Sequence, residues 1–261
     1  MRFVTYDRRG HRRLGALLGD EVVDLPDAVG HPAFPATLEG LVSSNGGTVM
    51  DAAQAALERE DVRNAVAPRA RLLAPLLPAS LRSPGADEAV RRIVGPEDEV
   101  PWPEGAGWLD FQPKIAAVLG RSGRDLDPEK AKRIVFGYTL VSDWAVRDAS
   151  GDPDPHAERA PLAMGPCVVT ADEIDPQTTF MTVRVGGEEW AKGNLNGVAA
   201  NLMKLVALAS RDEELTAGDA FASSPFRTFG VEPGRQLWPG AVVELEAESI
   251  GLLRNRLGPR S

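Results

Sequence analysis

The chain has 261 residues and a formal net charge of −9 at pH 7, enough length for one large domain with a small appendage. The negative charge argues against non-specific nucleic-acid binding, because contact with phosphates needs a basic surface. The single cysteine, Cys167, excludes an intrachain disulfide and a zinc site built from cysteines. No apolar run approaches the roughly 20 residues that span a bilayer, and charged residues interrupt the N-terminus where a signal peptide would be apolar. We therefore expect a cytoplasmic protein that binds neither nucleic acid nor membrane.

The N-terminal part of the sequence predicts a small α+β unit. RFVTYD and RLGALLG have the composition of strands around a turn at Gly10, and EVVDL follows as a third strand. Residues 48–60 place apolar side chains at helical spacing, which predicts an amphipathic helix. RLLAP then begins a new unit, so we place a domain boundary between residues 1–68 and residues 69–261.

The larger part predicts a mainly β domain. Residues 82–107 are rich in proline, glycine and acidic residues and predict a long loop. One long helix is expected at 197–211, with Asn196 as its N-cap. Because strands dominate with few helices between them, a mixed barrel or sandwich is favoured over a parallel doubly wound sheet. The expected strands lie at 115–120, 133–144, 167–170, 180–190 (a hairpin turning at Gly186-Gly187) and 242–251.

Common catalytic motifs are missing from the sequence. There is no G-x-G-x-x-G after a strand, no Walker loop and no H-E-x-x-H. Cys167 precedes two valines and is interpreted as a small core residue. Every second position from 152 to 158 carries a side chain that could bind a cation: Asp152, Asp154, His156 and Glu158. Two prolines among them favour a solvated loop instead. His156 is therefore kept only as a candidate lid residue.

Several segments resemble the fumarylacetoacetate hydrolase family, in the family's order. DFQPKIAAVLG at 110–120 is similar to the family strand D-(Y/F)-E-x-E-L-A-x-V-(I/L)-G, and IVFGYTLVSDWAVRD at 134–148 to I-x-G-Y-T-x-x-N-D-W-S-A-R-D. The resemblance runs from about residue 70 to the C-terminus. It implies an α+β, mainly β fold, the family's mixed β-sandwich roll around a cavity, usually in a homodimer, with a small N-terminal domain. Further matching segments lie at 165–174, 185–195, 215–224 and 238–255.

The positions that would hold this family's divalent metal carry other side chains. The two glutamates of E-x-E correspond to Gln112 and Lys114, and an aspartate that precedes the family's catalytic histidine corresponds to Ser83. The histidine itself has no equivalent beyond Val90. Of the metal carboxylates, Asp143 remains. The resemblance therefore implies no cofactor, with Mg²⁺ as the second possibility and Asp143 as its ligand, because an ammonium group has only donors and repels a cation.

Two alternatives are open for each cationic residue of this site. Lys114 either pairs with Asp143 inside the cavity or, if Pro113 twists the strand, points to solvent. Arg147 either contacts a ligand or holds Asp148 or a backbone carbonyl. We predict Lys114, Asp143 and Arg147 as catalytic residues; Trp144 also fits a packing role. The predicted substrate-binding residues are Ser83, Gln112, Trp144, Ser150, His156 and Ser224.

Three functions are compatible with this altered site. The first is a metal-independent enzyme that isomerises, cyclises or decarboxylates a small oxo-acid or diketone-like compound, since these reactions need an anion-stabilising pocket and a proton relay. The second is a catalytically inactive family member that acts as a binding or scaffold protein. The third is an ordinary metal-dependent hydrolase of carbon–carbon bonds. In each case the expected partner is a small molecule.

Overall fold

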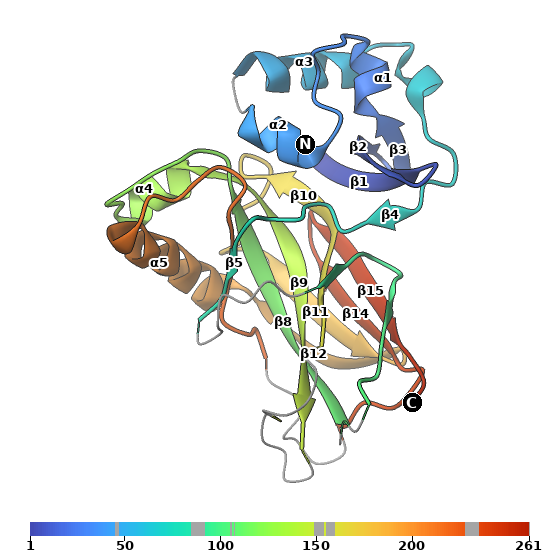
Figure 1. The fold of residues 1–261 in the computed structure, drawn as a ribbon, viewed down its shortest axis with the longest axis vertical. Coiled ribbons are helices and arrows are strands. Elements are labelled where there is room, and N and C mark those ends of the chain that lie inside the picture. Colours follow the sequence, from blue (N-terminus) through green and yellow to red (C-terminus); the bar gives the residue numbers. More distant parts are fainter. Residues whose placement is uncertain are drawn as a thin grey trace.

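A computed structural model describes residues 1–44, 47–84, 92–104, 106, 108–148, 154, 160–227 and 235–260. Most of the strands belong to one large mixed sheet in the order β3-β2-β1-β10-β9-β8-β13-β5, with β4 beside β1 and β6 beside β10 (Figure 1). A second sheet has the order β12-β11-β14-β15-β7. The mainly β architecture with mixed sheets is thus confirmed. None of the helices in the described ranges is both long and apolar enough to cross a bilayer.

The strands of the large sheet are β1 (Arg2–Arg8), β2 (His11–Leu18), β3 (Glu21–Asp24), β4 (Leu72–Leu73), β5 (Leu81–Arg82), β6 (Ile93–Val94), β8 (Trp108–Leu119), β9 (Val135–Arg147), β10 (Leu162–Thr170) and β13 (Ala220–Ala222). Those of the second sheet are β7 (Glu99–Val100), β11 (Phe180–Val185), β12 (Glu188–Asn194), β14 (Val242–Ala247) and β15 (Gly251–Leu257). The helices are α1 (Leu25–Val29), α2 (Leu38–Ser43), α3 (Gly47–Leu57), the 3₁₀ turn η1 (Val62–Ala65), α4 (Pro128–Arg133) and α5 (Asn196–Asp212).

Strands β8 and β9 form the centre of the large sheet and are buried on both faces. One face packs on the second sheet, where Phe111, Ile115 and Trp144 share a core with Val183 and Leu245. Val118, Phe136 and Val168 on the other face belong to a separate core with apolar residues of the N-terminal region. Burial on both faces explains why these strands read as long hydrophobic runs and not as an alternation.

The N-terminal region is joined to the rest of the sheet through β1. Arg2 and Phe3 pair antiparallel with Val169 and Val168 of β10, and the Phe3 ring stacks on Phe136 with centroids 5.7 Å apart. Figure 1 shows β1–β3 and α1–α3 together at one end of the molecule, over the end of β10. The boundary after residue 68 stays a prediction, since the two parts share both a sheet and a core.

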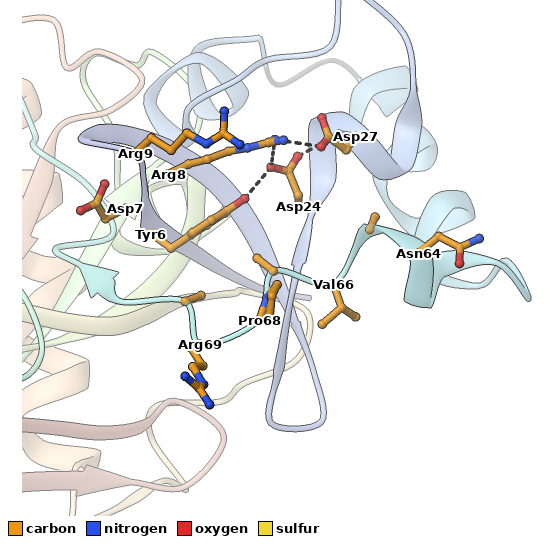
Figure 2. A pocket seen from close by; sticks show the side chains of 13 residues that line it. Tyr6, Asp7, Arg8, Arg9, Asp24, Asp27, Asn64, Val66, Pro68 and Arg69 are labelled. Atoms are coloured by element: carbon orange, nitrogen blue, oxygen red, sulfur yellow. Dashed lines mark hydrogen bonds and ion pairs between the residues drawn. The ribbon is translucent and has the colours of Figure 1, made fainter.

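A polar cluster fixes the N-terminal region internally. The buried Asp24 carboxylate caps α1 by accepting a hydrogen bond from the Asp27 amide at 2.8 Å. It also accepts from Tyr6 Oη at 2.5 Å, and it pairs with Arg8 and Arg13 (Figure 2). Burial alone would raise the pKa of Asp24, but the hydrogen bonds from Arg13, Tyr6 and Asp27 outweigh it and lower that pKa. The carboxylate therefore stays ionised and links β1, β2 and α1.

Three expectations about elements need correction. The segment 242–251 forms two paired strands, β14 and β15, because the chain reverses where Ser249 has φ 69°. β8 begins at Trp108 and not at residue 115. Asn196 is the first residue of α5 and not its cap; the Asn194 side chain accepts the hydrogen bond of the Asn196 amide at 2.6 Å.

Candidate functional site

A ladder of polar side chains lies on one face of β8 and β9. Side chains two residues apart on a strand point to the same face, so Asp110, Gln112 and Lys114 share a face of β8. Gln112 pairs with Asp143 in the antiparallel register, which puts Asp143 and Arg147 of β9 on that same face. Further along the same face the side chains are apolar, and Ala116, Val118 and Val141 pack there against the N-terminal region.

Lys114 is held in a buried ion pair at the centre of this ladder. Its ammonium group donates to Asp143 Oδ2 at 2.6 Å and to Ser83 Oγ at 2.8 Å. The Lys114 side chain is 3% exposed and that of Asp143 12% exposed. A buried charge must be paired, and of the two alternatives for Lys114 the structure has the pair with Asp143. Pro113 does not turn the lysine toward solvent.

Ser83 reaches Lys114 through a chain of paired strands. It directly follows β5, which lies parallel to β13, and β13 is antiparallel to β8. The segment after β13 continues along β8, where the Phe226 amide donates to the Pro113 carbonyl at 2.7 Å. Ser224 lies on this segment, and its carbonyl oxygen accepts a hydrogen bond from Ser223 Oγ at 2.7 Å. Three sequence positions predicted as site residues, 83, 112 and 114, are thus brought beside Asp143.

Arg147 has a carboxylate partner that the sequence analysis missed. Its Nε and one terminal nitrogen donate to Asp110 Oδ2 at 2.8 and 2.6 Å, and Asp110 Oδ1 accepts from the Phe111 amide at 2.8 Å. The side chains of Arg147 and Asp110 are 10% and 1% exposed. Arg147 therefore pairs with Asp110 across the two strands; its catalytic role stays a prediction.

Trp144 lies on the opposite face from Lys114. Its ring is 1% exposed and packs against Phe111, with centroids 5.6 Å apart, and Phe111 in turn contacts Trp190. Alternation along β9 directs its neighbour Asp143 to the site and Trp144 to the core, so the structure has Trp144 in the packing role, and its substrate-binding role stays a prediction. The predicted residues Ser150 and His156 lie outside the described residues.

Comparison with known proteins identifies the family. The family described as "Fumarylacetoacetate (FAA) hydrolase C-terminal" matches residues 88–258. The chain belongs to the fumarylacetoacetate hydrolase family. It is 30% identical over 174 residues to oxaloacetate tautomerase fahd2, mitochondrial, of Xenopus laevis, covering 62% of this chain and 54% of that protein. It is 29% identical over 157 residues to oxaloacetate tautomerase YisK of Bacillus subtilis, covering 58% and 52%. The matched region thus spans about half the length of these two relatives.

Solved structures of the family share the whole fold. Maleylpyruvate hydrolase from Sphingobium sp. SYK-6, in complex with manganese (II) ion and pyruvate, aligns with a TM-score of 0.79 and 23% identity over 100% of both chains. 5-Carboxymethyl-2-hydroxymuconate delta-isomerase from Mycobacterium smegmatis aligns with a TM-score of 0.72 and 20% identity, also over 100% of both chains. At these identities the likeness establishes the fold and leaves the reaction open.

The described residues of the site do not fit the divalent cation that the fumarylacetoacetate hydrolase fold implies. A hard cation needs several oxygen ligands, whereas the Asp143 carboxylate is bound to the Lys114 ammonium at 2.6 Å. Within the described ranges no three histidine, cysteine, aspartate or glutamate side chains gather in a group that would hold a metal ion. The ammonium group already supplies the positive charge that neutralises Asp143.

A separate pocket of about 480 Å³ lies in the N-terminal region, beside the Asp24 cluster. Figure 2 shows Tyr6, Arg8, Asp24 and Asp27 directed at one another, while Arg69 points away from them. The charges at its centre already neutralise one another through the Asp24 and Asp27 ion pairs. The pocket is lined by residues 6–9, 24, 27 and 64–70, so it does not include the polar ladder of β8 and β9.

Cys167 is not a candidate nucleophile. The thiol is buried and donates to the Ile250 carbonyl at 3.1 Å. Burial raises the pKa of Cys167 to about 12, so the reactive thiolate is not formed at neutral pH. Its place in the core between the two sheets agrees with the interpretation from sequence.

Proposed function

We propose that this protein tautomerises or isomerises a small 2-oxo acid without a divalent cation, with the Lys114 ammonium as the group that stabilises the enolate. The single observation that carries the proposal is the buried Lys114–Asp143 pair, with its N–O distance of 2.6 Å. A cation held in a poorly solvated site interacts with a developing negative charge far more strongly than it would in water. Lys114 thus has the electrostatic property that an enolate-forming reaction requires.

The proposed chemistry moves one proton between a carbon and an oxygen. Tautomerisation of a 2-oxo acid removes a proton from carbon 3 and places one on the carbonyl oxygen, through an enolate. An ammonium has three N–H donors, and Asp143 and Ser83 accept from Lys114 at 2.6 and 2.8 Å, which leaves one donor for the substrate oxygen. Asp143 is the adjacent base that takes the proton from carbon 3 and returns it to the oxygen. No water has to be positioned, in contrast to hydrolysis.

The names of relatives support this class of reaction. Two of them are oxaloacetate tautomerases, and one structural neighbour is a delta-isomerase. Each of these reactions relocates a proton and breaks no carbon–carbon bond. A 2-oxo dicarboxylic acid such as oxaloacetate is therefore the first substrate to test.

The test follows the decay of enol-oxaloacetate by ultraviolet absorbance in the presence of EDTA. We expect the unmodified protein to remain active in EDTA and Lys114→Met to lose about 100-fold or more in kcat, the usual effect of removing a donor to an oxyanion. Lys132→Met, at an exposed lysine of α4, is the matched control and should retain full activity. Activity that EDTA abolishes and Mn²⁺ or Mg²⁺ restores would instead support a metal-dependent enzyme. A complete lack of activity would favour the second function, a catalytically inactive family member that binds a small molecule.

A further inference from the structure

We infer that Ser83 is a second donor to the substrate oxyanion, beside Lys114; this inference rests on the proposed function. The Ser83 hydroxyl accepts a hydrogen bond from Lys114 Nζ at 2.8 Å. A hydroxyl also carries one proton to donate, and within the described residues that proton has no acceptor. Lys114 Nζ and Ser83 Oγ are 2.8 Å apart, so the free N–H of the lysine and the O–H of the serine are both available to one acceptor.

The position of Ser83 is set by backbone pairing and not by Lys114 alone. Residues 81 and 82 of β5 pair with Ala220 and Phe221, and the Ala220 amide donates to the Ser80 carbonyl at 2.9 Å. Arg82 adds an ion pair with Glu213 at 2.6 Å. Donors that are fixed before the substrate arrives need no reorganisation during the reaction, which is what makes an oxyanion site effective.

Exposure also distinguishes the two donors. Lys114 is 3% exposed, whereas Ser83 and Gln112 are half-buried. A small ligand therefore reaches Lys114 from the side of Ser83. Two converging donors next to one carboxylate suit an enolate oxygen, which carries more charge than the ketone oxygen of the ground state. Ser83 should consequently contribute more to kcat than to KM.

The experiment measures binding of oxalate, a stable planar mimic of an enolate, by calorimetry in EDTA. We expect Ser83→Ala to bind oxalate about tenfold more weakly, since a hydrogen bond to a charged group is lost. Ser83→Thr keeps the hydroxyl and should stay within about threefold of the unmodified protein. Ser80→Ala is the matched control, because Ser80 Oγ donates to Asp219 at 2.8 Å on the same segment and outside the ladder; its oxalate affinity should be unchanged.

Three results of the binding experiment would overturn the role of Ser83. They are unaltered oxalate binding by Ser83→Ala, no oxalate binding by the unmodified protein, and equal weakening by Ser80→Ala, which would indicate a general disturbance of the segment. The enol-oxaloacetate assay decides the proposed function separately. If the protein binds oxalate in a Ser83-dependent manner but has no activity, the anion site at Ser83 is supported and the proposed tautomerase activity is refuted. If Ser83→Ala is active with an unchanged kcat, the protein is a tautomerase in which Ser83 does not donate to the oxyanion.

Discussion

At the scale of single residues, the Lys114–Asp143 pair should contribute to stability because it is buried. Replacing one partner leaves the other charge unpaired in the interior, which typically costs about 3–5 kcal/mol. We expect Lys114→Met and Asp143→Asn each to lower the free energy of unfolding by this amount, and the double variant to recover part of the loss. Urea unfolding of the three variants measures the coupling. Single effects that add to within about 0.5 kcal/mol would mean that the pair does not stabilise the fold.

An exposed pair with the same geometry provides the control for this cycle. Arg184 and Glu246 lie across β11 and β14 with an N–O distance of 2.6 Å, the same as in the buried pair. Their side chains are 34% and 49% exposed, and an exposed pair contributes only about 0–1 kcal/mol. Arg184→Met and Glu246→Gln should therefore change the free energy of unfolding little, so that a large effect at Lys114 reflects burial and not distance.

A second prediction concerns metal binding. We expect the unmodified protein to bind Mg²⁺ or Mn²⁺ weakly or not at all, and Lys114→Glu to bind either ion more tightly, because it puts a second carboxylate beside Asp143. Without metal, the like charges should destabilise Lys114→Glu, and added metal should restore part of the loss. Calorimetric titration and thermal unfolding are the measurements, with Lys132→Glu as control. A stoichiometric micromolar site in the unmodified protein would refute the prediction.

Only part of this site could be predicted from sequence. The Lys114–Asp143 pair was predictable, because both residues occupy ligand positions of a motif and strand alternation directs Lys114 to the ligand face. The Arg147–Asp110 pair was not, because it depends on the antiparallel register in which Trp108 lies opposite Arg147. Ser83 was named from motif order, but its role as an acceptor from Lys114 follows from the β5–β13–β8 pairing.

At the scale of elements, Gly137 allows β9 and β10 to approach closely. A Cβ atom at this position would lie 2.2 Å from the Val169 carbonyl oxygen and 2.9 Å from Val168 Cγ1. Since a backbone atom cannot move aside, Gly137→Ala should cost at least the roughly 1–3 kcal/mol typical of overpacking. In Gly197→Ala, on α5, the added atom meets nothing within 4 Å, and higher helix propensity should stabilise by up to about 1 kcal/mol. Urea unfolding compares the two, and similar effects at both sites would contradict the argument.

The elements also show what local sequence predicts well. The strand at 133–144, the hairpin at 180–190 and the helix at 197–211 have clear patterns, and Gly186 and Gly187 take the positive φ values of 59° and 86° that the turn needs. The β14–β15 turn was missed because the positive φ at its centre falls on Ser249, which does not by itself indicate a turn, and Gly251, with φ 106°, lies at the end of the predicted strand. Strands β4 to β7 have two residues each and form only by pairing with neighbouring strands, so the sequence shows no alternation that would predict them.

At the scale of the whole molecule, the two parts of the chain should depend on each other. The resemblance to the family begins near residue 70, which by itself favours independent folding of residues 69–261. In the structure, however, Phe3, Leu14 and Leu41 are fully buried in one core with Val118 and Val168. Removal of residues 1–68 would expose that apolar face and the edge of β10. We now expect the truncated chain to aggregate or to unfold at lower urea concentration; a soluble fragment of unchanged stability would show that the core region is autonomous.

The tryptophan behind the site has an optical consequence. Trp144 is adjacent in sequence to Asp143, lies on the dry side of the sheet and contacts Phe111, which contacts Trp190. An anion that draws Lys114 toward itself must alter the electric field across β9, and an indole buried in an apolar core responds to such a field by a change in emission. The protein thus carries its own fluorophore one residue from its proposed chemistry. We expect oxalate to change the fluorescence of the native protein and Trp144→Phe to remove most of that change, which would make occupancy measurable without any label.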